Sequence, residues 1–406
     1  MKILVVSQYY PPEGVTIPAE IAQGLADKGH DVRVLTGFPN YPSGKIFPGY
    51  KQSWRSKEFD GQVSILRVPL VTDHSTSALR RMINYLSFAL SSATARNYAK
   101  NVDVIYIYAT QMTPAFGPWL WRKLGGAPYV LHVQDLWPES ILESSLVGES
   151  KLGKFIKTVL NPWLSNVYMN AAAIIGIAPS MVSTLKKRGG DPQNMELIFN
   201  WADDSVNPQK HNGESDSTEI LFAGNIGDMQ DLETVVRAAH LVEDIPVHVT
   251  VVGDGVARER VSNLAEELCC RNVSFRGSVP REEMAGIYAD ADFSLVTLRD
   301  LEVFRGTIPS KFQASISHGL PVISTVQGDL RGMVEDHNVG LTADAEDAES
   351  LAQSFREAHG MNASVYQELR MRARQTYNDH FSRRAGIDAV ETVLTNAALH
   401  SKGQDK

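Results

Sequence analysis

The chain of 406 residues is 43% apolar and 8% aromatic, which excludes disordered and fibrous proteins, and it is longer than the roughly 250–300 residues that one hydrophobic core usually supports. Its two cysteines, Cys269 and Cys270, are adjacent in a stretch expected to be helical, which excludes a disulfide framework and a cysteine-based metal site and favours a reducing compartment. The net charge of −8 is uneven: residues 1–202 carry 20 Lys and Arg against 14 Asp and Glu, and the remainder carries 19 against 33.

The first 200 residues alternate short runs rich in β-branched residues with helical patterns. This alternation predicts repeated βαβ units around a parallel sheet. The first run, in MKILVVS, is too short for a signal-peptide core or a membrane span, so a soluble or peripheral protein is expected. The predicted strands are KILVVS, DVRVLT, VSILRV, VDVIYIY, PYVLHV, AAIIGI and MELIFN.

A second series of the same kind follows the polar segment 202–218, which contains Pro and Gly, lacks periodicity and is the best linker candidate. Residues from about Ala345 onward are expected to be helical. The fold class is therefore predicted to be α/β, with one Rossmann-like architecture used twice. The strands expected in the second series are EILFAG, VHVTVVG, NVSFRG, DFSLVTL, LPVIST and VGLTA.

Polar residues gather where strands of the first half end, which is where open α/β sheets bind ligands. The turn SQYYPPEGVT leads into a helix whose backbone amides can hold an anion, with a plain tight turn as the alternative. The long aromatic loop 37–50 either contacts a ligand or only packs. In LHVQDLWPES, His132 can transfer a proton near neutral pH, and Asp135 either orients it or caps the next helix.

In the second half, Lys311 of TIPSKFQ falls in the first turn of a helix. A cation there opposes the helix dipole unless it serves an anionic ligand such as phosphate. The turn Gly253-Asp254-Gly255 follows a strand, so a nucleotide can lie over it, although one such turn is a weak signal. The sequence contains no His/Cys cluster, and the D-x-D at Asp290 spans a helix end and a strand start, so no metal is expected.

Two cationic stretches of the first half favour contact with an anionic membrane. Arg80 and Arg81 begin one predicted helix, and Lys151, Lys154 and Lys157 share one face of another. The alternative is a chance imbalance of charge on ordinary solvated surfaces.

Six segments of the sequence, taken together, resemble the family 4 retaining glycosyltransferases of the GT-B fold. The segments are YYPPEGVTIPAEIAQGLADKGHDVRVLTGFPNYPSGK, HVQDLWPES, FAGNIGDMQDLETVVRAA, VVGDG, IPSK and HGLPVIST. They are most similar to the subgroup that builds colanic acid, O-antigen and capsule, including amino-fucosyl transferases. The resemblance implies two Rossmann-like domains facing across a cleft. It implies an acceptor-binding domain at 1–202, with a helix at about 383–406 crossing back to it, and a nucleotide-sugar-binding domain at 203–382.

The resemblance also implies a UDP-sugar or other nucleotide-sugar donor, no metal or other cofactor, and a polyprenyl-diphosphate-linked sugar acceptor. The enzyme would be cytoplasmic and peripheral at the inner face of the cell membrane. Gly14 matches the glycine loop near the donor phosphates, His132 the histidine beside the donor sugar, and Lys311 a phosphate-contacting lysine. The other donor-binding candidates are Asn200, Gly224, Asn225, Gly253, Asp254, Gly277, Val279 and Arg305. The acceptor or membrane candidates are Tyr41, Arg80, Arg81, Lys151, Lys154 and Lys157.

The sequence departs from this family at three positions. Asn225 and Gln230 stand where many members carry Arg and Lys, and Ala314 replaces the second of two paired glutamates, which puts ribose recognition in doubt. These departures leave two alternatives open: a nucleotide-sugar-binding scaffold without turnover, and a sugar-nucleotide epimerase on the same fold.

Overall fold

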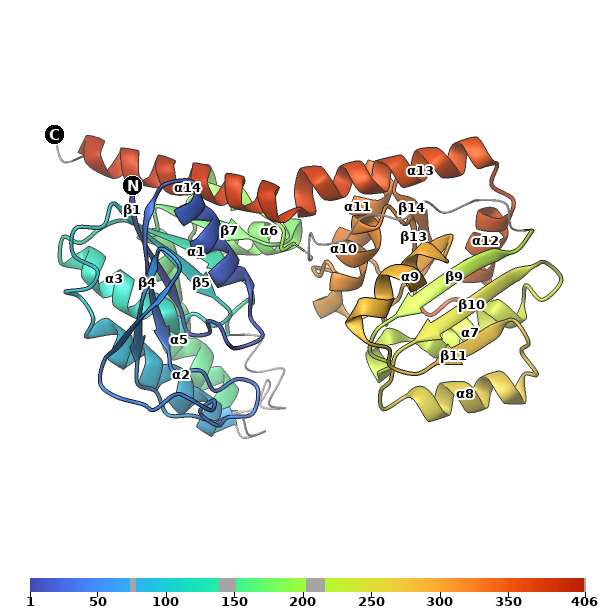
Figure 1. The fold of residues 1–406 in the computed structure, drawn as a ribbon, viewed down its shortest axis with the longest axis horizontal. Coiled ribbons are helices and arrows are strands. Elements are labelled where there is room, and N and C mark those ends of the chain that lie inside the picture. The colour runs from blue at the N-terminus through green and yellow to red at the C-terminus, as the bar shows by residue number, and fades with distance from the viewer. Residues whose placement is uncertain (74–77, 139–150, 202–215, 405–406) are drawn as a thin grey trace. The chain divides into compact units, whose positions relative to one another are not determined.

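The computed structural model describes residues 1–73, 78–138, 151–201 and 216–404 (Figure 1). The chain divides into two compact units. Unit 1 comprises Met1–Asn200 and Gly386–Lys406, and unit 2 comprises Trp201–Ala385. From the sequence, the boundaries were expected after residues 202 and 382.

Unit 1 is built on an eight-stranded sheet in the order β3-β4-β2-β1-β5-β6-β7-β8. Every neighbouring pair is parallel except β3 and β4. The strands β5 and β6 are buried along their whole length, as near-continuous apolar runs are in parallel sheets covered on both faces. The bounds are β1 Lys2–Ser7, β2 Asp31–Gly37, β3 Ser56–Asp60, β4 Val63–Val68, β5 Val104–Ala109, β6 Tyr129–Val133, β7 Ala173–Gly176 and β8 Met195–Leu197.

The antiparallel edge strand β3 is absent from the seven strands predicted for this half. Its sequence, SKEFD, has three charged residues in five and lacks an apolar face. It pairs through its backbone with β4 alone. Charged side chains are typical of sheet edges, where they discourage pairing with other chains.

The helices of unit 1 include one contributed by the end of the chain. In α14, Asp388 and Glu391 pair with Lys28, at Nζ–O distances of 2.5 and 2.7 Å. Gly24 of α1 makes room for α14, since a Cβ there would lie 2.5 Å from Cδ1 of Ile387. The helices of this unit are α1 Ile17–Asp27, α2 Ala78–Ala93, α3 Phe116–Lys123, α5 Lys151–Met169, α6 Pro179–Lys187 and α14 Arg383–Gln404.

Unit 2 has a six-stranded sheet, all parallel, in the order β11-β10-β9-β12-β13-β14. All six strands predicted from the sequence are present. Their bounds are β9 Thr218–Ala223, β10 Val247–Val252, β11 Val273–Arg276, β12 Phe293–Val296, β13 Val322–Ser324 and β14 Gly340–Thr342.

The helices of unit 2 pack on this sheet around an apolar core that includes Phe222, Val249 and Phe355. The cysteines are not helical, contrary to the prediction, because α8 ends at Glu267 and Cys269 has φ +54°. Within the described residues, no helix is both long and apolar enough to cross a membrane. The helices are α7 Leu232–His240, α8 Arg258–Glu267, α9 Met284–Ala289, α10 Ser310–Ser317, α11 Asp329–His337, α12 Ala348–His359 and α13 Ala363–Thr376.

Both units are thus α/β, Rossmann-like domains with parallel sheets. The strand order reverses between β1 and β5 in unit 1 and between β9 and β12 in unit 2. In open α/β sheets, ligands bind outside the carboxyl ends of the strands at such a reversal. These two sheet edges are therefore the places to look for a site.

Candidate functional site

In unit 2, Lys311 reaches over the carboxyl end of β9 from the first turn of α10. Its Nζ lies 4.2 Å from the centre of the Phe222 ring. Burial lowers the pKa of Lys311 to about 8. No carboxylate of the described residues forms an ion pair with it, so a half-buried cation stands without a counter-charge at this edge of the sheet. Such a group is the expected partner of an anionic ligand.

The backbone beside Lys311 carries no side chains because glycines follow the neighbouring strands β9 and β10. Gly224 follows β9, and a Cβ added there would lie 2.6 Å from Cε of Lys311. Gly253 follows β10, and its added Cβ would lie 2.0 Å from the carbonyl oxygen of Gly224. Both have φ +137°, a conformation that side chains disfavour. Next to them, Asp254 Oδ1 accepts a hydrogen bond from the Gly255 amide at 2.8 Å. The turns after β9 and β10 therefore approach each other and the lysine closely, with no side chain of Gly224 or Gly253 between them.

The two residues that replace the expected Arg and Lys lie in the turn after β9. Gln230 Oε1 accepts hydrogen bonds from the Gly227 amide at 3.0 Å and from Asn225 Nδ2 at 3.4 Å. These neutral side chains therefore hold their own loop. Ala314, at the position of the missing glutamate, packs against an apolar cluster that includes Leu221.

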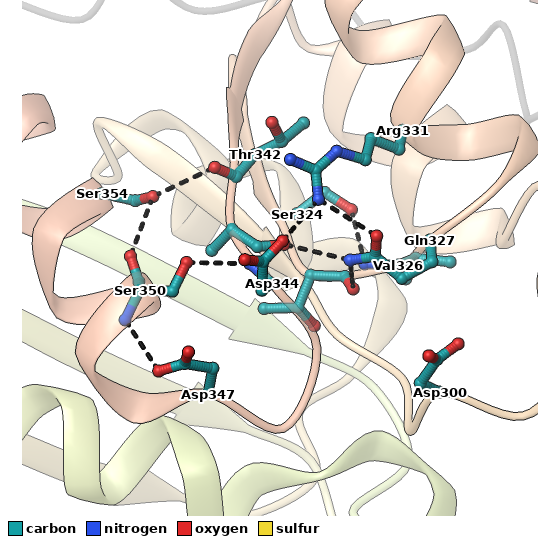
Figure 2. A network of polar contacts seen from close by, with 12 residues as sticks. Asp300, Ser324, Val326, Gln327, Arg331, Thr342, Asp344, Asp347, Ser350 and Ser354 are labelled. Carbon is teal, nitrogen blue, oxygen red and sulfur yellow. Dashed lines mark hydrogen bonds and ion pairs between the residues drawn. The ribbon is translucent and has the colours of Figure 1, made fainter.

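A polar network fixes the loops that follow β13 and β14, and Figure 2 shows its members converging from α11, α12 and the strand ends. Arg331 Nη1 donates to Gln327 Oε1 at 3.0 Å and to Asp344 Oδ1 at 2.8 Å. The Asp344 amide donates to Ser350 Oγ at 2.9 Å, and Asp347 Oδ1 accepts from the Ser350 amide at 2.9 Å. This network supports the same sheet edge from the side opposite β10 in the strand order.

The remaining unit 2 candidates lie on loops near this edge. Gly277 follows β11, and Val279 packs on the apolar cluster beside β9 and β10. Arg305 has an internal partner, because its guanidinium donates to both carboxylate oxygens of Asp300 at 2.8 and 2.6 Å. That pair is exposed, so a ligand would have to compete with Asp300 for Arg305.

In unit 1, His132 lies within β6 and is fully buried. Its Nδ1 is 2.5 Å from the hydroxyl of Tyr106, and the rings of Tyr106 and Tyr108 meet it edge-on with centres 5.9 Å away. Burial lowers the pKa of His132 to about 3, and a backbone contact with Ile198 opposes this shift only weakly. The imidazole is therefore neutral at physiological pH and is a hydrogen-bonding group in this state, not a ready proton donor.

Asp135 does not orient His132 as expected. The side chain that hydrogen-bonds the imidazole is that of Tyr106, which projects from the neighbouring strand β5. Asp135 lies beyond the end of β6 and is exposed, and the packing of neighbouring groups around its carboxyl raises the pKa of that carboxyl.

The turn after β1 carries Gly14, and no atom lies within 4 Å of the position of a Cβ there. The preceding residue, Glu13, is buried and was not recognised from the sequence. Its carboxylate accepts backbone hydrogen bonds from Tyr10 at 3.0 Å, Asn40 at 2.7 Å and Tyr41 at 2.8 Å. Burial raises the pKa of Glu13 despite these bonds. Glu13 thus joins the glycine turn to the aromatic loop 37–50.

The structure gives the surroundings of some of the other unit 1 candidates but not of all. Tyr41 is partly exposed, with its ring centre 5.2 Å from that of Tyr9. Asn200 Nδ2 donates to Gln134 Oε1 at 2.7 Å near the end of β6. Arg80 is exposed, with Asp73 at 3.9 Å, and Arg81 lies near Tyr85. Helix α5 begins at Lys151, but the side chains of Lys151, Lys154 and Lys157 lie outside the described part of the chain.

Two family descriptions match this chain. The one described as Glycosyl transferase 4-like domain matches residues 14–201, and the one described as Glycosyl transferases group 1 matches residues 217–359. The chain belongs to the family 4 glycosyltransferases. Each of the two matched regions of this glycosyltransferase contains one sheet with its candidate residues.

Individual proteins are similar to this glycosyltransferase over most of its length. A protein of Escherichia coli (strain K12), named as the colanic acid biosynthesis glycosyl transferase WcaI, is 29% identical over 378 residues, which are 88% of this chain and 92% of that protein. A glycosyltransferase structure from Rickettsia africae ESF-5 has a TM-score of 0.68 at 15% identity and covers 98% of both chains. HepE of Anabaena, in complex with UDP-glucose, has a TM-score of 0.62 at 14% identity, covering 97% of this chain and 99% of its own. The structural likeness establishes the GT-B fold.

Proposed function

We propose that this glycosyltransferase moves a hexosyl or N-acetylhexosaminyl group from a UDP-sugar to a polyprenyl-diphosphate-linked sugar, with retention of anomeric configuration, during surface polysaccharide synthesis. The donor assignment rests on the environment of Lys311. This half-buried cation has no carboxylate partner among the described residues, and it lies beside Gly224 and Gly253, which carry no side chains. HepE, which shares the fold, is in complex with UDP-glucose. WcaI, the E. coli relative, is named for colanic acid, which supports the polysaccharide pathway.

The proposed acceptor is a lipid, so the enzyme is expected to work at the cytoplasmic face of the membrane. Unit 1 offers a surface suited to this contact. Ile83, Leu86 and Leu90 are exposed on α2 at helical spacing, and we call them the α2 stripe. Exposed Arg80 lies at the start of the same helix. An apolar stripe that begins with a cation matches the acyl boundary and the anionic headgroups of a bilayer.

A second group extends this surface at the other end of α2. Trp54 is 62% exposed, and the guanidinium carbon of Arg55 lies 5.1 Å from the centre of its ring. Arg55 also hydrogen-bonds Thr94, the residue that follows α2. A tryptophan paired with an arginine suits the interface between lipid and water.

The test is a transfer assay with purified protein, radiolabelled nucleotide sugars and a lipid extract from polysaccharide-producing cells. The label is expected to pass into the organic phase with the lipid, and nuclear magnetic resonance of the product is expected to show the donor's anomeric configuration. A label that stays in the aqueous phase contradicts the lipid acceptor.

A second candidate is a nucleotide-sugar-binding scaffold without turnover. It is favoured by Asn225 and Gln230, which bond to each other where many family members carry Arg and Lys. Calorimetry that detects donor binding, together with no transfer and no donor hydrolysis, supports this candidate. Isomerisation of the donor in the same reaction would instead indicate an epimerase.

A further inference from the structure

Gln134 is the first residue beyond β6, and it extends the sheet. Its amide donates to the Ala109 carbonyl at 2.9 Å, and its side chain is 7% exposed. Residues two apart in an extended strand share a face, so Gln134 follows His132 along one side of β6. From there Gln134 Oε1 accepts the hydrogen bond from Asn200 Nδ2 at 2.7 Å.

Within the part of the chain that the structure describes, this carboxamide pair keeps two buried polar atoms without a hydrogen-bond partner. They are Gln134 Nε2, a donor, and Asn200 Oδ1, an acceptor. Buried polar groups are nearly always paired in native proteins, because leaving one unpaired costs stability. Two of them on side chains that contact each other, at the edge where open α/β sheets bind ligands, indicate a site that its ligand completes.

The other carboxamides at this sheet edge provide the contrast. Gln8 follows β1 and Gln111 lies two residues beyond β5, and both are as buried as Gln134. Gln8 Nε2 donates to Asn84 Oδ1 and Gln111 Nε2 donates to Gln8 Oε1, each at 2.6 Å. Asn84 Nδ2 donates to the Val71 carbonyl at 2.7 Å, and Gln111 Oε1 accepts from Thr110. Every amide oxygen and nitrogen of this network is paired, whereas Asn40 Oδ1, in the loop after β2, lacks a partner among the described residues. Carboxamides buried at this edge can therefore be fully paired, and the open atoms of Gln134 and Asn200 stand out because they belong to two amides that contact each other.

The two open atoms define the chemistry of the ligand. Phosphate oxygens that carry the diphosphate charge only accept hydrogen bonds, and an ammonium only donates them, whereas a hydroxyl does both. The pair leaves one donor and one acceptor whichever amide donates within it. We propose that Gln134 and Asn200 bind hydroxyl groups of a sugar substrate, with one amide donating and the other accepting. This inference rests on the proposed transfer reaction and assigns part of its sugar recognition to this pair.

The sugar can be that of the donor or that of the acceptor, and two measurements separate these sources. For the donor, calorimetry gives the affinities of the parent and of Gln134→Met for UDP and for a panel of UDP-, GDP- and dTDP-sugars. If the pair binds the donor sugar, the variant keeps its affinity for the free nucleotide and loses about five- to tenfold in affinity for the nucleotide sugar. If the pair binds the acceptor sugar, donor affinities stay equal and the KM for the lipid extract rises by a similar factor.

A stability measurement distinguishes a ligand site from a structural pair. The double variant Gln134→Met/Asn200→Leu removes both open atoms together with the bond between the amides, so its melting temperature is expected to equal or exceed that of the parent. The matched control Gln111→Met deprives Gln8 Oε1 of its buried donor, so its melting temperature falls while its affinity for nucleotide sugars is kept.

The outcomes that overturn the inference differ from those that overturn the function. If the parent transfers sugar and Gln134→Met has the same donor affinity and the same KM for the acceptor as the parent, the hydroxyl site is overturned and the proposed function stands. A double variant that melts well below the parent shows a structural pair and overturns it as well. A parent that binds no nucleotide sugar and transfers nothing overturns the proposed function along with the site.

Discussion

At the scale of single residues, Lys311 has opposite effects on stability and on binding. Its pKa is about 8 in the folded protein and about 10.4 in an unfolded chain, so folding disfavours its charged form. That penalty is present in full below pH 8 and disappears as the pH rises towards 10.4. Lys311→Met is therefore expected to raise the free energy of unfolding at pH 7 by on the order of 1–2 kcal/mol, a figure that allows for solvent screening of a half-buried group. The same variant should bind UDP less tightly.

Urea denaturation at pH 7 and at pH 9.5 measures the first effect, and calorimetry with UDP measures the second. Lys123→Met is the matched control, because Lys123 also lies over an aromatic ring, 5.0 Å from the centre of Trp119, but is exposed. This control keeps Lys311, so its stability should change between the two pH values as that of the parent does, whereas Lys311→Met should lose the part of the change that Lys311 causes. Equal UDP affinity in Lys311→Met and the parent would remove Lys311 from the donor site.

The buried imidazole of His132 makes a prediction about pH. Because its pKa is about 3, the ring stays neutral from pH 5 to pH 9. Titration of His132 should therefore cause no change in the rate of sugar transfer near pH 6.5. If His132 lies beside the reacting sugar, as the family resemblance implies, His132→Ala should lower kcat more than donor affinity, since such a group acts mainly on the transition state. Nuclear magnetic resonance titration of the parent checks the pKa, and a His132 signal that titrates between pH 6 and 7 would contradict the assignment.

Residue types and spacing were enough to predict some of these groups but not others. Lys311 was recognisable because a cation in the first turn of a helix is locally unfavourable. Tyr106 was not recognised as the partner of His132, because that pairing depends on which faces of β5 and β6 meet. Glu13 and Gln134 gave no signal either, since a polar residue in a turn is usually solvated and only the folded structure shows them buried.

At the scale of elements, the docking of α14 depends on the absence of a side chain at Gly24. Gly24→Val is expected to push Ile387 away and to destabilise this contact by about 1–3 kcal/mol. Hydrogen exchange of residues 386–400 should become faster, while the strands of unit 2 remain protected. Gly332→Val is the control, because a Cβ on that helical glycine meets no atom within 4 Å. Unchanged exchange in α14 would show that Ile387 adapts without loss.

The predicted elements agree with the structure where burial produces a pattern. The strands β1, β5 and β6 are apolar and buried on both faces, so their sequences identify them. The edge strand β3 was missed because its backbone pairing with β4 leaves its side chains free to be charged. The sequence predicts an end of α8 that is too late, because Cys269 adopts a left-handed backbone conformation that its residue type does not predict.

At the scale of the whole molecule, the positive balance of residues 1–202 and the α2 stripe predict salt-sensitive binding to anionic vesicles. Each cation near the surface contributes up to about 1 kcal/mol. Arg80→Gln/Arg81→Gln should bind less at low salt, and Leu86→Ser/Leu90→Ser should bind less at every salt concentration. Sedimentation with vesicles of phosphatidylglycerol and phosphatidylcholine measures both. Leu399→Ser, an exposed leucine of unit 1 outside the stripe, is the control. Equal binding to pure phosphatidylcholine would show that charge plays no part.

The repetition of one architecture was predictable at this scale, because alternating strands and helices restart after a polar linker. The family followed from the motifs taken as a set, since they lie in both matched regions. What the sequence alone did not reveal is which side chains remain unpaired, because pairing depends on three-dimensional neighbours.

The membership of residues 386–406 in unit 1 has a consequence for biosynthesis. A ribosome makes the chain from the amino end, and domains usually fold as units in that order. Here the last helix of unit 1 leaves the ribosome only after all of unit 2 has been made, so Lys28 and Gly24 lack their partners until unit 2 has been synthesised. During that interval the first domain is expected to expose the apolar surface that α14 later covers, and it then becomes a substrate for chaperones that bind nascent chains.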